Sequence, residues 1–114
     1  MLWGALEEEA VEHCLFDRNQ KFDIGGVLYQ LVQRSTGRQY FGVTDCLIPR
    51  LRAHVSYSTR SSAHLHQQIK AQGARDFDVH KIASVQHGRE TLLELERAII
   101  LHRNTLWPNG LNMI

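Results

Sequence analysis

The chain has 114 residues, of which 43% are hydrophobic and 22% charged. This size and composition are typical of one folded domain and exclude extensive disorder or a second folded unit. No apolar run approaches the roughly 20 residues that a membrane-spanning helix needs. The first residues lead into an acidic stretch rather than a basic signal-peptide flank, so we expect a cytoplasmic protein without membrane contact.

Charge is unevenly distributed, although the formal net charge is only +1. Residues 1 to 23 carry six acidic and two basic side chains, whereas residues 24 to 114 carry eleven basic and six acidic ones. A basic body fits a phosphate-backbone partner, because neutralising phosphates releases counterions. An ordinary solvated surface explains the same charge equally well.

The cysteines and the closest histidine pair do not indicate a metal site. Cys14 and Cys46 are far apart in the sequence and lack the spacing of zinc ligands, so we expect two reduced thiols. His64 and His66 form an HxH pair without neighbouring cysteines or carboxylates, which favours two partly exposed surface histidines over metal ligands.

An N-terminal helix is predicted over residues 5 to 16. Apolar residues recur there at helical spacing, and acidic residues near its start suit the helix dipole. We therefore divide the chain into an acidic helical extension, residues 1 to 23, and a body, residues 24 to 114. A stabilising role is the favoured interpretation of the extension, and self-association or shielding of a basic cleft are the alternatives.

A β-hairpin is predicted at the start of the body. Residues 27 to 33 are rich in β-branched and aromatic side chains, a turn at Ser35-Thr36-Gly37 follows, and residues 39 to 43 form the second strand. Tyr29 and Tyr40 then lie one on each strand, where either alone is an ordinary packing residue.

A helix is predicted to follow the hairpin directly. Thr44 or Asp45 can cap it, and it runs to about His54. Arg50 and His54 are four residues apart, which places both side chains on one face of this helix.

The rest of the body is predicted to contain two more helices and a third strand. We expect a helix over about residues 63 to 72, a half-buried strand over residues 77 to 82, and a long helix between residues 88 and 104. The apolar stripe of the long helix includes Leu92, Leu95 and Ile99, and Glu96 lies at its border. A partly buried carboxylate there needs a partner or a metal ion.

Two short tyrosine motifs and the polar residues after them resemble the GIY-YIG nucleases. The motifs are Val27-Leu28-Tyr29 and Tyr40-Phe41-Gly42, with apolar residues in place of isoleucine and the leading glycine of the first displaced by Val27. The family order continues through the remaining polar positions from there to the C-terminus: Arg50, His54, Glu96, Asn104-Thr105 and Asn112. The resemblance implies an α+β fold with a small three-stranded, mostly antiparallel sheet flanked by helices, here with the extra N-terminal helix.

The resemblance also implies a role for the residues that would handle protons. Hydrolysis of a phosphodiester needs a base near the attacking water. Tyr29 is the expected general base or water-orienting phenol, Tyr40 positions its neighbours, and His54 orients or relays a proton for the tyrosines. A tyrosine with its ordinary pKa of about 10 needs positive charge nearby to act at neutral pH.

The remaining implied roles concern the phosphate and a metal ion. Arg50 is expected to bind the scissile phosphate as a fixed positive charge. Glu96 is the expected ligand of one divalent ion, Mg²⁺ with Mn²⁺ as a substitute, because Mg²⁺ keeps several waters and takes few protein carboxylates. Asn112 is expected to brace the site from the C-terminal segment.

The implied activity is that of a homing-endonuclease-like catalytic domain, a metal-dependent endonuclease that cuts DNA, with double strands favoured. The candidates for a DNA-facing surface are Arg52, Arg60, Lys70 and Arg75, for which solvated charge is an equal explanation. We expect low sequence specificity, or specificity supplied by homodimerisation or a partner protein, because 114 residues leave no length for a separate recognition region.

Two alternatives remain open at this point. One is a catalytically inactive module of the same fold that binds nucleic acid or protein, and the other is a nuclease that prefers RNA or single strands. On analogy alone, the small size favours a phage or mobile-element setting in a bacterial or phage-infected cell.

Overall fold

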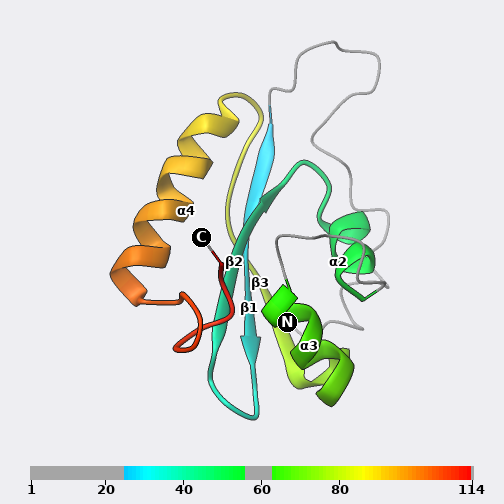
Figure 1. Cartoon of the computed structure of the whole chain (residues 1–114). Helices are drawn as coiled ribbons and strands as arrows, with labels where there is room; N and C mark the ends of the chain where they lie inside the picture. Colours follow the sequence, from blue (N-terminus) through cyan, green and yellow to red (C-terminus); the bar gives the residue numbers. More distant parts are fainter. Residues whose placement is uncertain (1–24, 56–62, 114) are drawn as a thin grey trace.

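The computed structural model describes residues 25–55 and 63–113 (Figure 1). The predicted N-terminal helix, the whole extension from residue 1 to 23, and Arg60 lie outside the described residues. No helix in the described part of the chain is long and apolar enough to cross a membrane.

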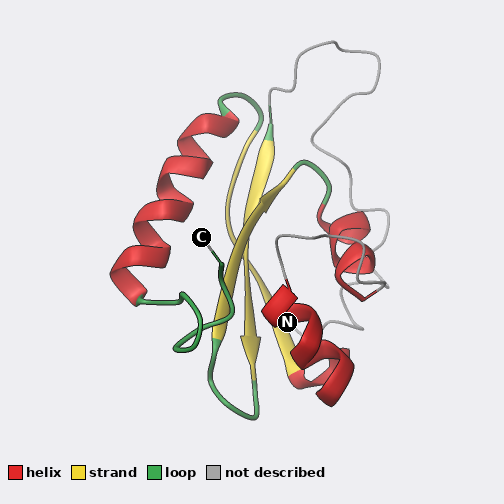
Figure 2. Cartoon of the chain, viewed as in Figure 1, coloured by secondary structure: helices red, strands yellow, loops and turns green. Residues whose placement is uncertain are grey.

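Three strands form one antiparallel sheet, as predicted (Figure 2). They are β1 (Gly26–Gln33), β2 (Gln39–Thr44) and β3 (Phe77–Val85), and β1 lies in the centre, paired with both others. The hairpin turn between β1 and β2 contains Gly37 at φ 76°, a backbone conformation that glycine adopts without steric cost. The fold class expected from the sequence is confirmed.

Helices cover both faces of this sheet. On one side lie α2 (Leu47–Val55) and α3 (Ala63–Gln72), which is followed by the short 3₁₀ helix η2 (Ala74–Asp76), and on the other lies α4 (Arg89–Arg103) (Figure 1). The strand alternation separates two apolar cores accordingly. Tyr29, Leu31 and Tyr40 belong to the core with α2 and α3, whereas Leu28 and Phe41 pack with α4.

The third strand differs from its prediction in length and regularity. It continues to Val85, three residues beyond the predicted end, and its register with β1 shifts between Leu28 and Tyr29. Such an irregularity bends a strand and re-aims its side chains, and it is often found beside functional residues. Here it directly precedes the tyrosine of the first motif.

The buried stripe of α4 agrees with its prediction at Leu92 and Ile99 but not at Leu95. Leu92 is buried and Ile99 and Ile100 are partly buried against the sheet, but Leu95 is 40% exposed, so its prediction as a stripe residue is wrong. Residues four apart share a helical face, and Glu96 follows Leu92 by four positions. Glu96 therefore lies within the stripe that faces the sheet.

Cys46 is not a free thiol. The prediction of a reduced thiol is wrong at this position, because disulfide formation depends on the distance between two cysteines in the fold and not on their separation in the sequence. Cys14 lies outside the described residues.

Candidate active site

A cleft of about 240 Å³ lies where β1, β2, α2, α4 and the C-terminal segment meet. It is lined by five of the six residues that the sequence proposed for the site: Tyr29, Tyr40, Arg50, Glu96 and Asn112. The sixth, His54, is buried and in hydrogen-bond contact with Tyr29. The fold thus brings together residues separated by more than eighty positions in the chain.

Tyr29 can lie across β2 because its partner on that strand is a glycine. The backbone register pairs Tyr29 with Gly42. A Cβ atom added to Gly42 would lie only 2.5 Å from Tyr29 Oη and 2.6 Å from Tyr29 Cζ, closer than van der Waals contact allows. The glycine of the second motif therefore provides the space for the tyrosine ring of the first.

The Tyr29 phenol is neutral at physiological pH. Burial raises its pKa well above the ordinary value of 10, and Tyr40 raises it further through charge and a hydrogen bond. The positive charge of Arg50 lowers the pKa of Tyr29, but burial and Tyr40 raise it. A phenolate is therefore not the resting form of this residue.

His54 provides the proton acceptor that a neutral phenol needs. Its Nε2 lies 2.8 Å from Tyr29 Oη, and its ring packs edge-on against Tyr40 with centroids 5.4 Å apart. Burial, followed by His66 and Arg50, lowers the pKa of His54 to about 3. The imidazole is thus uncharged at neutral pH.

His66 is a member of this buried group that the sequence analysis missed. It is 8% exposed and its Nε2 lies 3.2 Å from His54 Nδ1, so its prediction as a surface histidine is wrong. The signal was present in the apolar positions around it: Leu65 and Ile69 mark the buried stripe of α3, and His66 lies beside Leu65 on that face. His64, which is partly exposed, stacks on Trp107 with ring centroids 4.2 Å apart.

Glu96 enters the cleft from α4 as a partly buried carboxylate. Burial raises its pKa above the ordinary value, against the effect of nearby Arg97. Among the described residues, Glu96 makes no hydrogen bond or ion pair, and no group of three or more potential His, Cys, Asp or Glu ligands exists there. A lone hard oxygen donor fits a Mg²⁺ ion that keeps most of its waters and does not fit a zinc site.

The side chain of Asn112 forms hydrogen bonds that connect separate segments of the chain. Its Oδ1 accepts hydrogen bonds from the Phe41 backbone N–H at 3.0 Å and from the Thr105 hydroxyl at 2.9 Å, and its Nδ2 donates to the Phe41 carbonyl at 2.8 Å. Phe41 belongs to β2 and Thr105 follows α4. The side chain therefore joins the C-terminal segment, β2 and the end of α4, which is the geometry of the expected bracing residue.

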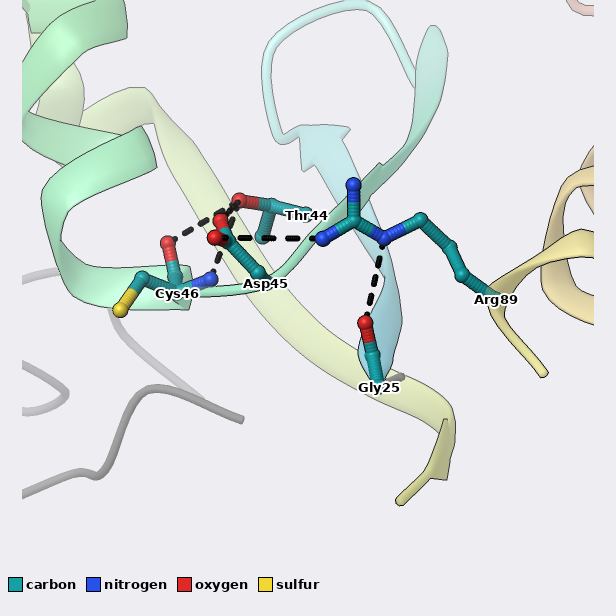
Figure 3. Close-up of polar contacts among 5 residues, drawn as sticks. All are labelled: Gly25, Thr44, Asp45, Cys46 and Arg89. Atoms are coloured by element: carbon teal, nitrogen blue, oxygen red, sulfur yellow. Dashed lines mark hydrogen bonds and ion pairs between the residues drawn. The ribbon is translucent and has the colours of Figure 1, made fainter. Parts of the chain in front are cut away.

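A second connection, not foreseen from the sequence, holds the other end of α4 (Figure 3). Arg89, the first residue of α4, donates from Nε to the Gly25 carbonyl at 3.1 Å and lies 3.9 Å from the Asp45 carboxylate. Gly25 precedes β1, and Asp45 precedes α2, which carries Arg50. The helix that presents Glu96 is thus linked at both ends to the elements that present the other cleft residues.

The three selected basic residues that the structure describes do not line the cleft. Arg52, Lys70 and Arg75 are exposed, and none of them lines it. Two other arginines contact aromatic rings near it: Arg38 lies 4.9 Å from the Trp107 ring centroid and Arg103 lies 5.6 Å from that of Phe41, a cleft residue.

This architecture and the grouping of its polar residues define a domain with the GIY-YIG fold, as the motifs suggested. The structure is similar to the catalytic domain of the intron endonuclease I-TevI, determined for a variant with one glutamate replaced by alanine. That match has a TM-score of 0.65 and 18% identity and covers 80% of this chain and 95% of that one. A second structure of the catalytic domain, described as that of the homing endonuclease I-TevI, matches with a TM-score of 0.64 and 18% identity over 78% of this chain and 98% of the other.

The sequence itself matches no protein-family model and no curated protein. At 18% identity the structural likeness establishes the fold.

Proposed function

We propose that this chain is a metal-dependent endonuclease that hydrolyses phosphodiester bonds in DNA. The observation that carries the proposal is the cleft in which a buried tyrosine, an arginine and an unpaired carboxylate meet from three different elements. Structural ion pairs do not account for this arrangement, because Glu96 forms none with Arg50 or any other described residue. The shared fold with an endonuclease catalytic domain supports the same conclusion.

The proton-handling side of the cleft consists of Tyr29 and His54. Because burial keeps Tyr29 protonated, the phenol accepts the proton of an attacking water only as it gives its own proton to His54 Nε2. The water oxygen then forms the new bond to phosphorus as the bond between phosphorus and the leaving oxygen breaks, and the proton taken from the water side is held on the imidazole. The Tyr40 ring packs against the rings of both Tyr29 and His54 and holds them in position relative to each other.

The phosphate side of the cleft consists of Arg50 and Glu96. Arg50 supplies a permanent positive charge to the non-bridging oxygens, where charge accumulates in the transition state. Glu96 would hold a divalent ion, which would supply further positive charge to stabilise the negative charge that develops in the transition state. Glu96 itself needs to be ionised to hold it, so the cation must overcome the burial that raises the pKa of this carboxyl.

Double-stranded DNA is the proposed substrate, with low intrinsic sequence specificity. The polar groups of the cleft suit phosphate oxygens, and contacts to phosphates position a nucleic acid without reading its bases. Specificity would then come from a homodimer or a partner protein.

Matched substrates test this proposal. Duplex DNA, single-stranded DNA and RNA of one sequence are incubated with the purified protein in Mg²⁺, in Mn²⁺ and in excess EDTA. We expect cleavage of the duplex with either metal and none in EDTA, and loss of cleavage in Arg50→Ala. Cutting of RNA alone would contradict the assignment to DNA, and tight binding without cutting of any substrate would identify an inactive module.

A further inference from the structure

We propose that His66 is a positioning residue that fixes His54 in the tautomer whose Nε2 can take the proton of Tyr29. This inference rests on the proposed nuclease function and adds to it a residue outside the motif set. It stands on a continuous line of three buried side chains contributed by β1, α2 and α3.

The line is defined by two contacts. Tyr29 Oη and His54 Nε2 lie 2.8 Å apart, and His54 Nδ1 and His66 Nε2 lie 3.2 Å apart. The two imidazole rings meet edge to face with centroids 5.4 Å apart. Both histidines are buried, at 0% and 8% exposure, so each ring nitrogen in the line depends on a protein partner.

The direction of the hydrogen bonds follows from basicity. A neutral imidazole nitrogen is a far better proton acceptor than a phenolic oxygen, so Tyr29 donates to His54 Nε2. The proton of His54 must then sit on Nδ1, and it is donated to His66 Nε2. The tautomer of a histidine is set by the hydrogen bond that its other nitrogen makes, and His66 supplies that bond.

Among the charged and titratable groups around His54, His66 is the one that can accept the hydrogen bond from His54 Nδ1–H. Arg50 lies on the same helix, Tyr29 and Tyr40 face the ring from the sheet, and His66 faces it from α3. Arg50 opposes positive charge on His54, and Tyr29 is a protonated donor. Burial lowers the pKa of His66, which keeps His66 Nε2 an unprotonated acceptor at neutral pH. When His54 takes the proton of Tyr29, its bond to His66 becomes a stronger, charge-assisted one.

Two substitutions separate hydrogen bonding from simple packing. In His66→Gln the amide oxygen can still accept from His54 Nδ1–H, whereas the leucine side chain of His66→Leu carries no acceptor. His66→Met is a second apolar variant in case the branched leucine prevents folding, and circular dichroism checks the fold of each. His80→Leu, which removes an exposed histidine of β3, is the matched control.

The tautomer is measured directly on the full chain by long-range ¹H–¹⁵N correlation of the imidazole nitrogens. We expect the proton of His54 on Nδ1 in the wild type, His66→Gln and His80→Leu, and loss of this tautomer in His66→Leu. A folded His66→Leu protein with an unchanged tautomer, or a wild type protonated on Nε2, would overturn the proposal. This measurement does not depend on cleavage, so an inactive wild type would count against the proposed function alone.

Cleavage kinetics supply the second measurement. General-base assistance is worth about 10² to 10⁴ in rate, so kcat should fall about 100-fold in His66→Leu while KM and the Mg²⁺ dependence stay the same. His66→Gln should stay within about tenfold of the wild type, because it restores the acceptor. Equal losses in the two folded variants would show that the hydrogen bond to His54 is not what His66 contributes.

Discussion

At the scale of single residues, the position of Tyr29 depends on the missing side chain of Gly42. We predict that Gly42→Ala destabilises the fold by about 2 kcal/mol, as overpacking of a full core does. Its Cβ would lie 2.5 Å from Tyr29 Oη and push the ring from His54. Cleavage should fall at least about tenfold, since small displacements of reacting groups are costly. Thermal melts and cleavage rates measure the two effects.

Gly26→Ala is the matched control for this change. Gly26 lies in the same sheet, but a Cβ there would meet its nearest neighbours, side-chain atoms of Arg89 and Leu92, at 3.4 Å. We expect cleavage close to the wild-type rate. If Gly26→Ala and Gly42→Ala reduced activity equally, the loss would reflect a general disturbance of the sheet and not the placement of Tyr29.

Protonation of His54 should make stability depend on pH. Folding lowers the pKa of this residue from 6.5 to about 3, so between these values the unfolded chain binds the extra proton. The contribution of His54 to the free energy of unfolding should therefore be complete above about pH 6.5 and decrease as the pH drops below it. For one proton, this decrease is at most about 1.4 kcal/mol per pH unit.

Urea titrations of the wild type and His54→Gln from pH 7 to pH 4.5 test this prediction. The difference between the two proteins isolates His54 from the carboxyl groups that titrate in the same range. We expect the wild type to lose stability more steeply than the variant. Parallel curves would mean that His54 is not held neutral by burial.

Motif order in the sequence indicated most of the polar residues that line the cleft, but it did not indicate the contacts behind them. Tyr29, Arg50 and Glu96 were accessible through motif order, which needs no structure. His66 and Arg89 were not, because their roles come from elements that meet only after folding: His66 touches His54 across two helices, and Arg89 reaches the start of β1. Neither pairing has a fixed spacing along the chain.

At the scale of the elements, Asn112 determines whether the C-terminal segment stays attached to β2. We predict that Asn112→Ala lowers the free energy of unfolding by about 3 kcal/mol, because both backbone groups of buried Phe41 lose their partner. Denaturant titration measures this loss. Cleavage should also decrease, since Asn112 and Met113 form one wall of the cleft.

Asn109→Ala provides the comparison, because Asn109 is exposed in the turn just before Asn112. A surface substitution of this kind is expected to change stability by no more than about 0.5 kcal/mol. An Asn112→Ala protein as stable as Asn109→Ala would show that the C-terminal segment is held mainly by Leu111 and its backbone hydrogen bond to Gln39.

The hydrophobic periodicity of the sequence predicted the positions of the strands and helices better than it predicted which of their residues are buried. The strand and helix positions of the described body agree with the sequence analysis to within about three residues. The orientation of α4 was less accessible: a helix so rich in leucine offers several overlapping stripes, and its tertiary contacts select the one that contains Leu92 and Glu96 and leaves Leu95 exposed. Helical spacing alone cannot choose between such neighbours.

At the scale of the whole molecule, the sheet between two helical layers explains how the cleft is assembled. The helices α2 and α3 lie on one face of the sheet and α4 lies on the other (Figure 1). Arg50 of α2 and Glu96 of α4 both line the cleft beside β2. The C-terminal segment closes the remaining side through Asn112. The groups proposed to bind the phosphate and the metal ion therefore come together only in the complete body, and no single hairpin or helix pair contains the cleft.

The most direct test of the proposed nuclease site compares Glu96→Gln with Glu94→Gln in nicking of supercoiled DNA in Mg²⁺. Both variants remove one carboxylate from α4, but Glu94 is exposed and outside the cleft. We predict wild-type cleavage in Glu94→Gln and a loss of at least about 100-fold in Glu96→Gln, as expected when metal-derived charge stabilisation is lost. Equal cleavage by a folded Glu96→Gln protein and the wild type would contradict the assignment of this cleft as a metal-dependent nuclease site.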